Sequence, residues 1–277
     1  MKANAITRIV IFSVVIIMLL AILAVGLGMG AFSFNFDFDT GEYITGDGSV
    51  PASAVHNLEI EWASGEITIE AQETDSINFT ETGNVPEGSE MVYELNGDTL
   101  TIRYSKPRLQ IGFFSTPSKQ LTITVPNNWR CDNLNIDTAA TDITAYNLNA
   151  YAVDLDSASG TCHFNECNIT ELDADTASGN IYYNGKLQKL DCDAASADIT
   201  GIFSEAPQQI NVDSASGQLD ITLPPECGFT VNMDTLSGKF NSDFATNTVN
   251  NKYVYGDGSC QINVDSASGN VTIRKGS

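Results

Sequence analysis

The residues of this chain that are best placed to do chemistry are aspartates, and they recur in one motif. The motif D-[ST]-A-S-G-x-[IVL] has four close copies and three degenerate ones, and a related segment, EWASGEI, begins at Glu61. The leading aspartates of the seven copies are Asp137, Asp156, Asp175, Asp193, Asp213, Asp234 and Asp265. The corner glycines, where a copy has one, are Gly160, Gly179, Gly217, Gly238 and Gly269. Successive leading aspartates are 19, 19, 18, 20, 21 and 31 residues apart, so only the last interval contains an insertion.

Two kinds of chemistry are open to aspartates in such an array. If the copies stack in register, neighbouring carboxylates lie about 4.8 Å apart, and each like-charged pair costs about 1 kcal/mol in water. A structural role would offset this cost, with each carboxylate accepting N–H groups of the corner that follows it. The alternative is a row of calcium sites, since Ca²⁺ takes several oxygen ligands; its candidates are Asp156, Asp175, Asp193 and Asp213. We expect the structural role and no cofactor, because the motif lacks the G-G-x-G-x-D form of calcium-binding β-rolls.

Cysteine and histidine offer little further chemistry. The six cysteines never form C-x-x-C, so a zinc knuckle or a thioredoxin-like motif is not indicated. Cys162, His163 and Cys167 resemble a ligand cluster, but a strand would point Cys162 and His163 to opposite faces. The repeat places Cys162 and Cys192 inside as small buried hydrophobes. An oxidising compartment would allow a disulfide among the remaining cysteines, but the sequence does not indicate which two would pair. The remaining cysteines are Cys131, Cys167, Cys227 and Cys260.

The charge of the chain excludes one class of partner. Lys and Arg number 13 and Asp and Glu 35, for a net charge of −22. Such a surface repels nucleic acid and anionic lipid headgroups, and it favours cations, basic partners or simple solubility. We therefore expect no nucleic-acid binding.

Apolar residues flank every aspartate at fixed offsets and predict the elements that position it. Aliphatic residues stand mostly three and one residues before the aspartate and six after it, while the residues between these positions are polar. This spacing on both sides of a small-residue corner is typical of strand–turn–strand. A coil of about 19 residues cannot bury its own apolar side and must stack on its neighbours. We predict an all-β fold, a parallel β-solenoid of seven to eight short coils; a β-sandwich with coincidentally similar strands is the alternative.

The N-terminal segment predicts a membrane anchor. The range Ile9–Ala31 holds 23 residues without a charge, and about 20 suffice to span the hydrocarbon core as a helix. Basic residues precede it and acidic ones follow, so the tail 1–8 should be cytoplasmic and the C-terminal part outside the cell membrane. A cleavable signal peptide is the alternative, although its apolar region is usually shorter, about 7–15 residues.

The remaining ranges complete the predicted organisation. Residues 32–54 have the composition of a linker, 55–130 form a less regular β part that caps the solenoid, and 131–277 hold the regular coils. Within the capping part, Asn96-Gly97 predicts a hairpin turn. Lys106–Pro117 predicts a loop whose two phenylalanines pack on the flank or contact a ligand or the membrane surface.

These residues resemble a bacterial family of domains of unknown function known as "putative adhesin" domains. The resemblance covers roughly Val55 to Ile273 and depends on the repeated SG corners, the opening LEIEWASGEITI and the strand LTITVP. The copy at Asp137 lacks the SG corner, and Ala197 replaces the glycine of another, which would strain a corner that required positive φ.

The predicted anchor, the regular stack and the lack of a catalytic constellation in the sequence together favour a non-enzymatic binding or scaffolding module of the adhesin-like kind, membrane-tethered and extracytoplasmic, with an unknown protein or glycan ligand at the cell envelope. One alternative is an envelope-stress sensor or accessory subunit that acts through a membrane partner. The other is a polysaccharide-active β-helix enzyme that uses paired carboxylates.

Overall fold

The computed structural model describes residues 43–105 and 118–277, and this part of the chain is all-β. The predicted span Ile9–Ala31, the tail 1–8 and the loop Lys106–Pro117 lie outside the described residues. Within the described ranges no helix has both the length and the apolar character to cross a membrane. The described residues, 43–105 and 118–277, belong to one compact unit.

The strands follow one another with a single short 3-10 helix among them. In chain order they are β1 (Ile44–Thr45), β2 (Gly48–Pro51), η1 (Ala52–Ala54), β3 (Asn57–Gln72), β4 (Ser76–Gly83), β5 (Val92–Asn96), β6 (Thr99–Arg103), β7 (Lys119–Pro126), β8 (Cys131–Tyr146), β9 (Asn149–Ser196), β10 (Ile199–Phe203), β11 (Gln209–Ser216), β12 (Leu219–Leu223), β13 (Phe229–Ser237), β14 (Phe240–Ser242), β15 (Asn247–Val249), β16 (Lys252–Tyr255), β17 (Cys260–Ser268) and β18 (Val271–Lys275).

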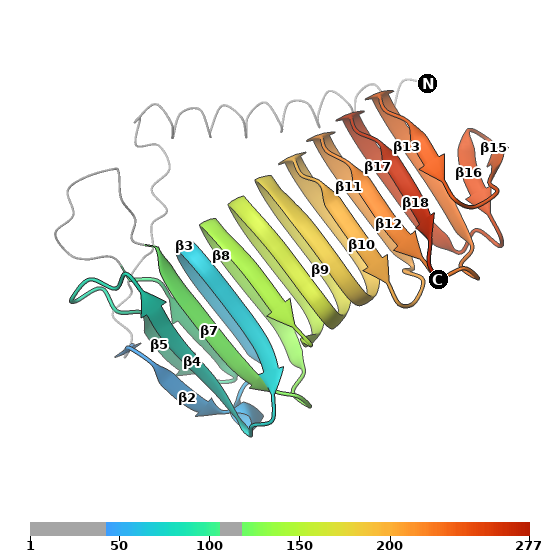
Figure 1. The fold of residues 1–277 in the computed structure, drawn as a ribbon. Helices are drawn as coiled ribbons and strands as arrows, with labels where there is room; N and C mark the ends of the chain where they lie inside the picture. The colour runs from blue at the N-terminus through green and yellow to red at the C-terminus, as the bar shows by residue number, and fades with distance from the viewer. Residues whose placement is uncertain (1–42, 106–117) are drawn as a thin grey trace, which may run out of the picture. The chain divides into compact units, whose positions relative to one another are not determined.

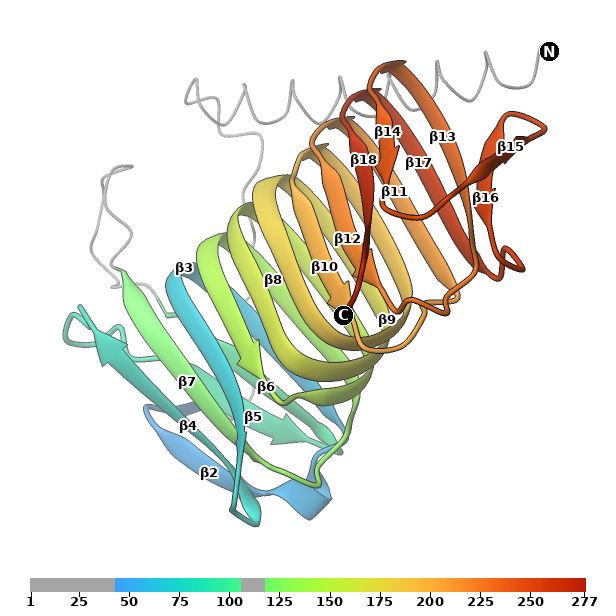
Figure 2. The same ribbon diagram turned by 45° about the vertical axis from the view of Figure 1, so that its right-hand side comes forward.

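The repeats stack as parallel coils in register, which gives the solenoid-like arrangement of Figures 1 and 2. Each coil has a first strand that carries the leading aspartate, a corner, and a second strand. In the pairing of β3 with β8, Leu58 lies opposite Leu134, Ile60 opposite Ile136 and Glu61 opposite Asp137. β8 pairs with β9, and β9 with β11, in the same register. The segment at Glu61 is therefore a full coil of the stack.

The predicted apolar positions face the interior and form one continuous core. The residues three before the aspartate are all at most 2% exposed, from Leu134 at 0% to Leu190 at 2%. The residues six after the aspartate are buried from Ile143 to Val271, with the partly buried Phe240 as the exception at the end of the stack. Stacking therefore removes from water the side that a single coil would leave exposed.

The order of the coils in space differs from their order in the sequence at the C-terminal end. The segments Gln209–Gly217 and Gln261–Gly269 have the same nine residues, QINVDSASG. β11 pairs with β17, and β17 pairs on its other side with β13. The last repeat therefore lies between the two repeats that precede it, and Asp265 is flanked by Asp213 and Asp234. The antiparallel hairpin of β15 and β16 lets the chain leave the stack and return.

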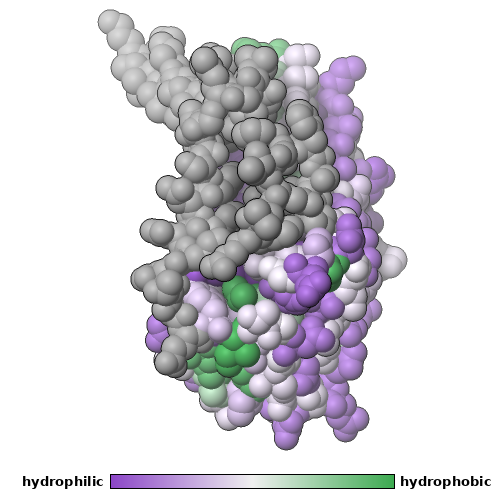
Figure 3. Space-filling view, turned by 90° about the vertical axis from the view of Figure 1, so that its left-hand side faces the viewer, coloured by the Kyte–Doolittle hydropathy of each residue, from purple (hydrophilic) through white to green (hydrophobic). Residues whose placement is uncertain are grey.

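The same interleaving occurs at the N-terminal end. β3 lies between β8 on one side and β6 and β7 on the other, all parallel to it. Antiparallel strands then close this end: β4 pairs with β2 and β7, and β5 pairs with β1 and β6. β1 and β2 lie within the predicted linker 32–54, so its described residues belong to the fold. This end faces the viewer in Figure 3, where most of the coloured residues are hydrophilic or intermediate and the largest group of hydrophobic ones lies at the lower left.

Corner glycines are required mainly because neighbouring backbones approach closely. A Cβ added to Gly269 would lie 1.9 Å from the carbonyl oxygen of Gly217, although Gly269 does not have a positive φ. Gly217 combines a close approach, 1.9 Å to the oxygen of Ala197, with a φ of +141°. Ala197 itself has no positive φ. The strain expected from a positive φ at this residue therefore does not arise.

A buried ion pair supports the N-terminal end. Lys119 and Glu81 are 0% and 3% exposed, and Lys119 Nζ lies 2.9 Å from Glu81 Oε1, without the angular geometry of a hydrogen bond. The ammonium group donates to the carbonyl oxygens of Ser89 and Ser105 and lies 4.1 Å from the centroid of the Tyr104 ring. The carboxylate also accepts the N–H of Met91. The pair thus ties β4, β7 and the segment before β5 together.

Replacing a corner glycine should destabilise the fold through contact alone. We expect Gly269→Ala to lower the stability by about 1–3 kcal/mol, because the new Cβ forces two corners apart. Thermal unfolding followed by circular dichroism measures the loss. Ala197→Gly is the control in the same column, and it should change the melting temperature little. An unchanged melting temperature for Gly269→Ala would show that the corners can separate without cost.

Removing one partner of the buried ion pair should lower the stability of the fold more than the removal of both partners would suggest. We expect Lys119→Met and Glu81→Gln each to destabilise the protein by about 3–5 kcal/mol, since each leaves a buried partner unsatisfied. The double variant should lose less than the sum of the two, and a double-mutant cycle in urea measures the coupling. Strict additivity would contradict this account of the pair.

Candidate functional site

The leading aspartates lie in one column on the outer face of the first strands. The structure brings together all seven, in the order Asp137, Asp156, Asp175, Asp193, Asp213, Asp265 and Asp234, with Glu61 before them. Arg103 on β6 lies opposite Glu61, and its Nε donates to Glu61 Oε1 at 2.9 Å. A cation thus closes the N-terminal end of the column.

A second acidic column runs beside the first, two residues earlier in each coil. Its central members are the exposed residues Asp154, Asp173 and Asp191. Toward the C-terminal end asparagine replaces aspartate, and Asn263 Nδ2 donates to Asn211 Oδ1 at 3.0 Å. Negative charge is therefore concentrated in the middle of the stack. We call this area the acidic face; it consists of Asp154, Asp156, Asp173, Asp175, Asp191 and Asp193. The sequence repeat already carried the signal for this second column, because its members stand two residues before each leading aspartate.

Several carboxyl groups of these columns have raised pKa values. Partial burial, followed by the neighbouring carboxylates of Asp193 and Asp156, raises the pKa of Asp175 to about 6. Partial burial and the carboxylates of Asp193 and Asp265 likewise raise the pKa of Asp213 to about 6. The pKa of Asp173 is also raised, first by burial and then by Asp191. Desolvation and like charges both disfavour the ionised form.

Hydrogen bonds to the corner amides come from a different position of the repeat than we expected. Asp142 Oδ1 accepts the N–H of Thr161 in the next coil at 2.8 Å. Asp198 Oδ1 accepts the N–H of Gln218 at 2.9 Å, and Asn270 Oδ1 accepts that of Lys239 at 3.0 Å. These residues stand five positions after the leading aspartates. They hold successive corners in register, while the leading carboxylates of the acidic face point to solvent.

Cys162 and His163 do not come together as a ligand pair. Cys162 is buried, whereas His163 points outward and stacks on Tyr182 with ring centroids 4.6 Å apart. Burial raises the pKa of Cys162 and of Cys192 to about 12, which disfavours the reactive thiolate. In residues 43–105 and 118–277, no three His, Cys, Asp or Glu side chains are grouped so that they could hold a metal ion. The calcium hypothesis for Asp156, Asp175, Asp193 and Asp213, which also involved the neighbouring hydroxyl groups, stays a prediction.

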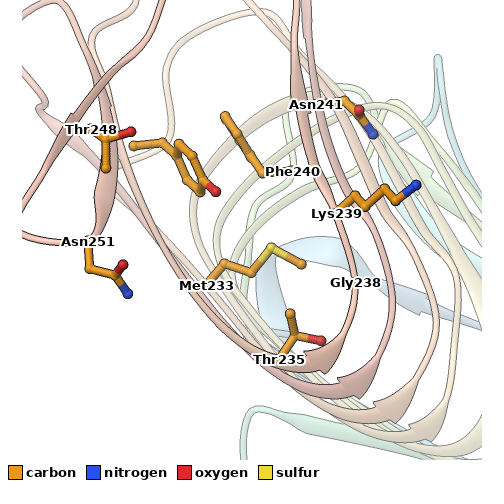
Figure 4. Close-up of a pocket in the computed structure, with 9 residues that line it drawn as sticks. Met233, Thr235, Gly238, Lys239, Phe240, Asn241, Thr248 and Asn251 are labelled. Carbon is orange, nitrogen blue, oxygen red and sulfur yellow. The ribbon is translucent and has the colours of Figure 1, made fainter.

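A pocket of about 420 Å³ lies at the C-terminal end of the stack. Met233 and Phe240 occupy interior columns of the last coil, but they face the hairpin β15–β16 instead of another coil (Figure 4). Phe240 stacks on Tyr253 with centroids 4.1 Å apart. Thr248 and Asn251 line the hairpin side, and Lys239 is the one charged residue of the lining. Among the described residues, the lining consists of amide, hydroxyl, aromatic and thioether groups together with Lys239, which suit the binding of a small group.

Comparison with known proteins identifies the family of the fold. A protein-family model described as Toastrack DUF4097 matches residues 55–274. Among curated proteins no significant relative is found.

Two of the solved structures that resemble the chain are described as adhesion proteins. A "putative adhesin" from Bacteroides fragilis is 15% identical, with a TM-score of 0.46 over 84% of this chain and 97% of that one. A "putative cell adhesion protein" from Clostridium sporogenes is 15% identical, with a TM-score of 0.41 over 85% of this chain and 100% of that one.

A third solved structure has a different description. It is a "putative lipid binding protein" from Parabacteroides distasonis, 15% identical, with a TM-score of 0.40 over 83% of this chain and 96% of that one. At such values, none of these likenesses indicates what this chain binds.

The raised pKa values predict that the protein becomes more stable as the pH falls. A carboxyl group whose pKa is about 6 in the folded chain and about 3.9 in the unfolded chain binds its proton more tightly when folded. Its contribution to stability is therefore complete below pH about 3.9 and is lost as the pH rises through about 6. We expect the melting temperature to rise between pH 7.5 and pH 5.

Neutral variants test the origin of this pH dependence. Asp175→Asn and Asp213→Asn should raise the melting temperature at pH 7.5 and flatten its dependence on pH. Glu73→Gln, which changes an exposed carboxylate outside the columns, should do neither. If the melting temperature depends on pH in the same way in all four proteins, charge repulsion within the columns does not destabilise the fold.

Proposed function

This chain belongs to the Toastrack DUF4097 family, and we propose that it is a non-enzymatic binding and scaffolding module held outside the cell membrane by its N-terminal segment. The acidic face is its interaction surface in this proposal, and a positively charged partner at the cell envelope is its ligand. The observation that carries the proposal is the regular stack itself, which presents the same outward side chains at each coil.

The charge of the acidic face supports a basic partner. Mutual repulsion contributes to the raised pKa values of Asp173 and Asp175, so a cation that approaches the face relieves an existing electrostatic cost. The net charge of −22 guides such a partner to the molecule over longer distances at low ionic strength. A basic protein segment or a cationic glycan has the required chemistry.

The sequence before the described residues supports the tether. Ile9–Ala31 is uncharged, Lys2 and Arg8 precede it, and Asp37 follows it shortly afterwards. An apolar segment of this length with a basic N-terminal flank is typical of a single-pass anchor whose C-terminal side is extracytoplasmic.

Two structural features support a role without catalysis. The aspartates of the acidic face stand on successive parallel strands and are exposed to solvent, and no group of three His, Cys, Asp or Glu side chains in the described residues could hold a metal ion. The pocket at the other candidate surface is lined by amides, hydroxyls, Met233 and aromatic rings, with Lys239 as its only charge. Such surfaces are sufficient for binding a partner.

Affinity capture with the full-length chain in detergent tests the proposal. Membranes of the source cell provide the partners, and bound proteins are eluted with rising salt. We expect a specific partner that elutes at moderate salt and is lost with the triple variant Asp156→Asn, Asp175→Asn, Asp193→Asn. The control Glu73→Gln, Glu87→Gln, Glu226→Gln removes three negative charges from exposed positions outside the columns, and it should retain the partner.

Two results would contradict the proposal. One is a partner that binds the triple aspartate variant as well as it binds the unmodified chain. The other is a deletion strain whose surface adhesion, envelope integrity and stress response all equal those of the parent strain.

A further inference from the structure

Two of the six cysteines meet at the place where the last repeat enters the stack. Cys227 lies in the turn between β12 and β13, and Cys260 is the first residue of β17. The carbonyl oxygen of Gly228, next to Cys227, accepts the N–H of Cys260 at 3.0 Å. The side chains of Cys227 and Cys260 hydrogen-bond to each other, and the two residues are 5% and 1% exposed.

The Cys227 thiol also donates to the carbonyl oxygen of Gly228 at 3.4 Å, and two of the other four thiols make contacts of the same kind. Cys131 and Cys167 donate to backbone carbonyl oxygens of their own and neighbouring coils. Cys162 and Cys192 occupy interior columns, with Ile143 opposite Cys162 and Val212 opposite Cys192. All six cysteines lie in the described part of the chain. Among them, Cys227 and Cys260 are the two whose thiols are close to each other.

We propose that Cys227 and Cys260 are joined by a disulfide when the chain matures in an oxidising compartment. The reaction is a thiol–disulfide exchange with a disulfide donor, either an oxidised dithiol oxidoreductase or oxidised glutathione. One cysteine thiolate attacks the donor disulfide and releases one donor thiolate, which gives a mixed disulfide. The second cysteine thiolate then attacks the sulfur of the first and releases the other donor thiolate. The pair loses two electrons and two protons, and the donor is reduced to two thiols.

The two thiols differ from each other in the folded chain. The hydrogen bond from the Cys260 thiol lowers the pKa of Cys227 below its ordinary value and raises that of Cys260.

The order of the coils sets the time at which the bond forms. β17 lies between β11 and β13, so β13 has no neighbouring coil until the last repeat is in place. Until then the two thiols are open to a disulfide donor, and afterwards they are buried. The bond closes a loop that contains β13 to β16 and holds the inserted coil in the stack. It restrains the unfolded chain and so stabilises the folded one.

Refolding of the purified full-length chain in detergent tests the proposal independently of its location in the cell. The reduced chain is unfolded, refolded with a mixture of reduced and oxidised glutathione, then denatured and alkylated. We expect alkylation of four of its six cysteines and a protease fragment in which Cys227 and Cys260 are linked. The oxidised form should melt roughly 5–15 °C above the reduced form.

Matched double variants separate this pair from the other cysteines. Cys227→Ala, Cys260→Ala should abolish the difference between the oxidised and reduced forms, and Cys131→Ala, Cys167→Ala should preserve it. The reduced unmodified chain provides the same comparison if either variant fails to fold. Six reactive thiols after refolding, or a bridge between other cysteines, would overturn the proposal. Because the donor is supplied in the test, a bond formed here but absent in cells would count against the proposed location and not against the pairing.

Discussion

In-register stacking of short parallel coils is the constraint on which the rest of this structure depends. A single coil has one apolar side and cannot bury it, so each coil provides the buried environment of the next. The register that aligns Leu58 with Leu134 also aligns Glu61 with Asp137. The core and the charged columns are therefore two results of one arrangement, and neither can change without the other.

The charged columns show how the protein tolerates the repulsion that this register creates. Arg103 pairs with Glu61 at one end, and asparagines replace aspartates in the second column toward the other end. Residues five positions after the leading aspartates hold the corners together through side-chain to backbone hydrogen bonds. The repulsion that remains is concentrated at the acidic face, where a cationic partner would relieve it. A surface that is costly alone and favourable in a complex is suited to recognition.

The two ends of the stack show how a solenoid avoids open edges. At each end a coil distant in the sequence inserts between its neighbours, and antiparallel strands cover the outside. Such edges would otherwise offer unpaired backbone groups to other chains. At the C-terminal end the hairpin β15–β16 covers the last coil only in part, and interior residues such as Met233 line a pocket there. The insertion also brings Cys227 to Cys260.

Much of the fold and part of the candidate site could be predicted from the sequence alone. The residues at −3 and +6 from each aspartate predicted an all-β fold of stacked coils, because burial of alternate residues on a strand is a local property. The column of leading aspartates followed from the same spacing. The order of the coils could not be predicted, since QINVDSASG at Gln209 and at Gln261 fits either neighbour equally well. The pairing of Cys227 with Cys260, the link between Lys119 and Glu81, and the pocket all depend on that order. Contacts between residues far apart in the chain decide it, and only the tertiary structure contains them.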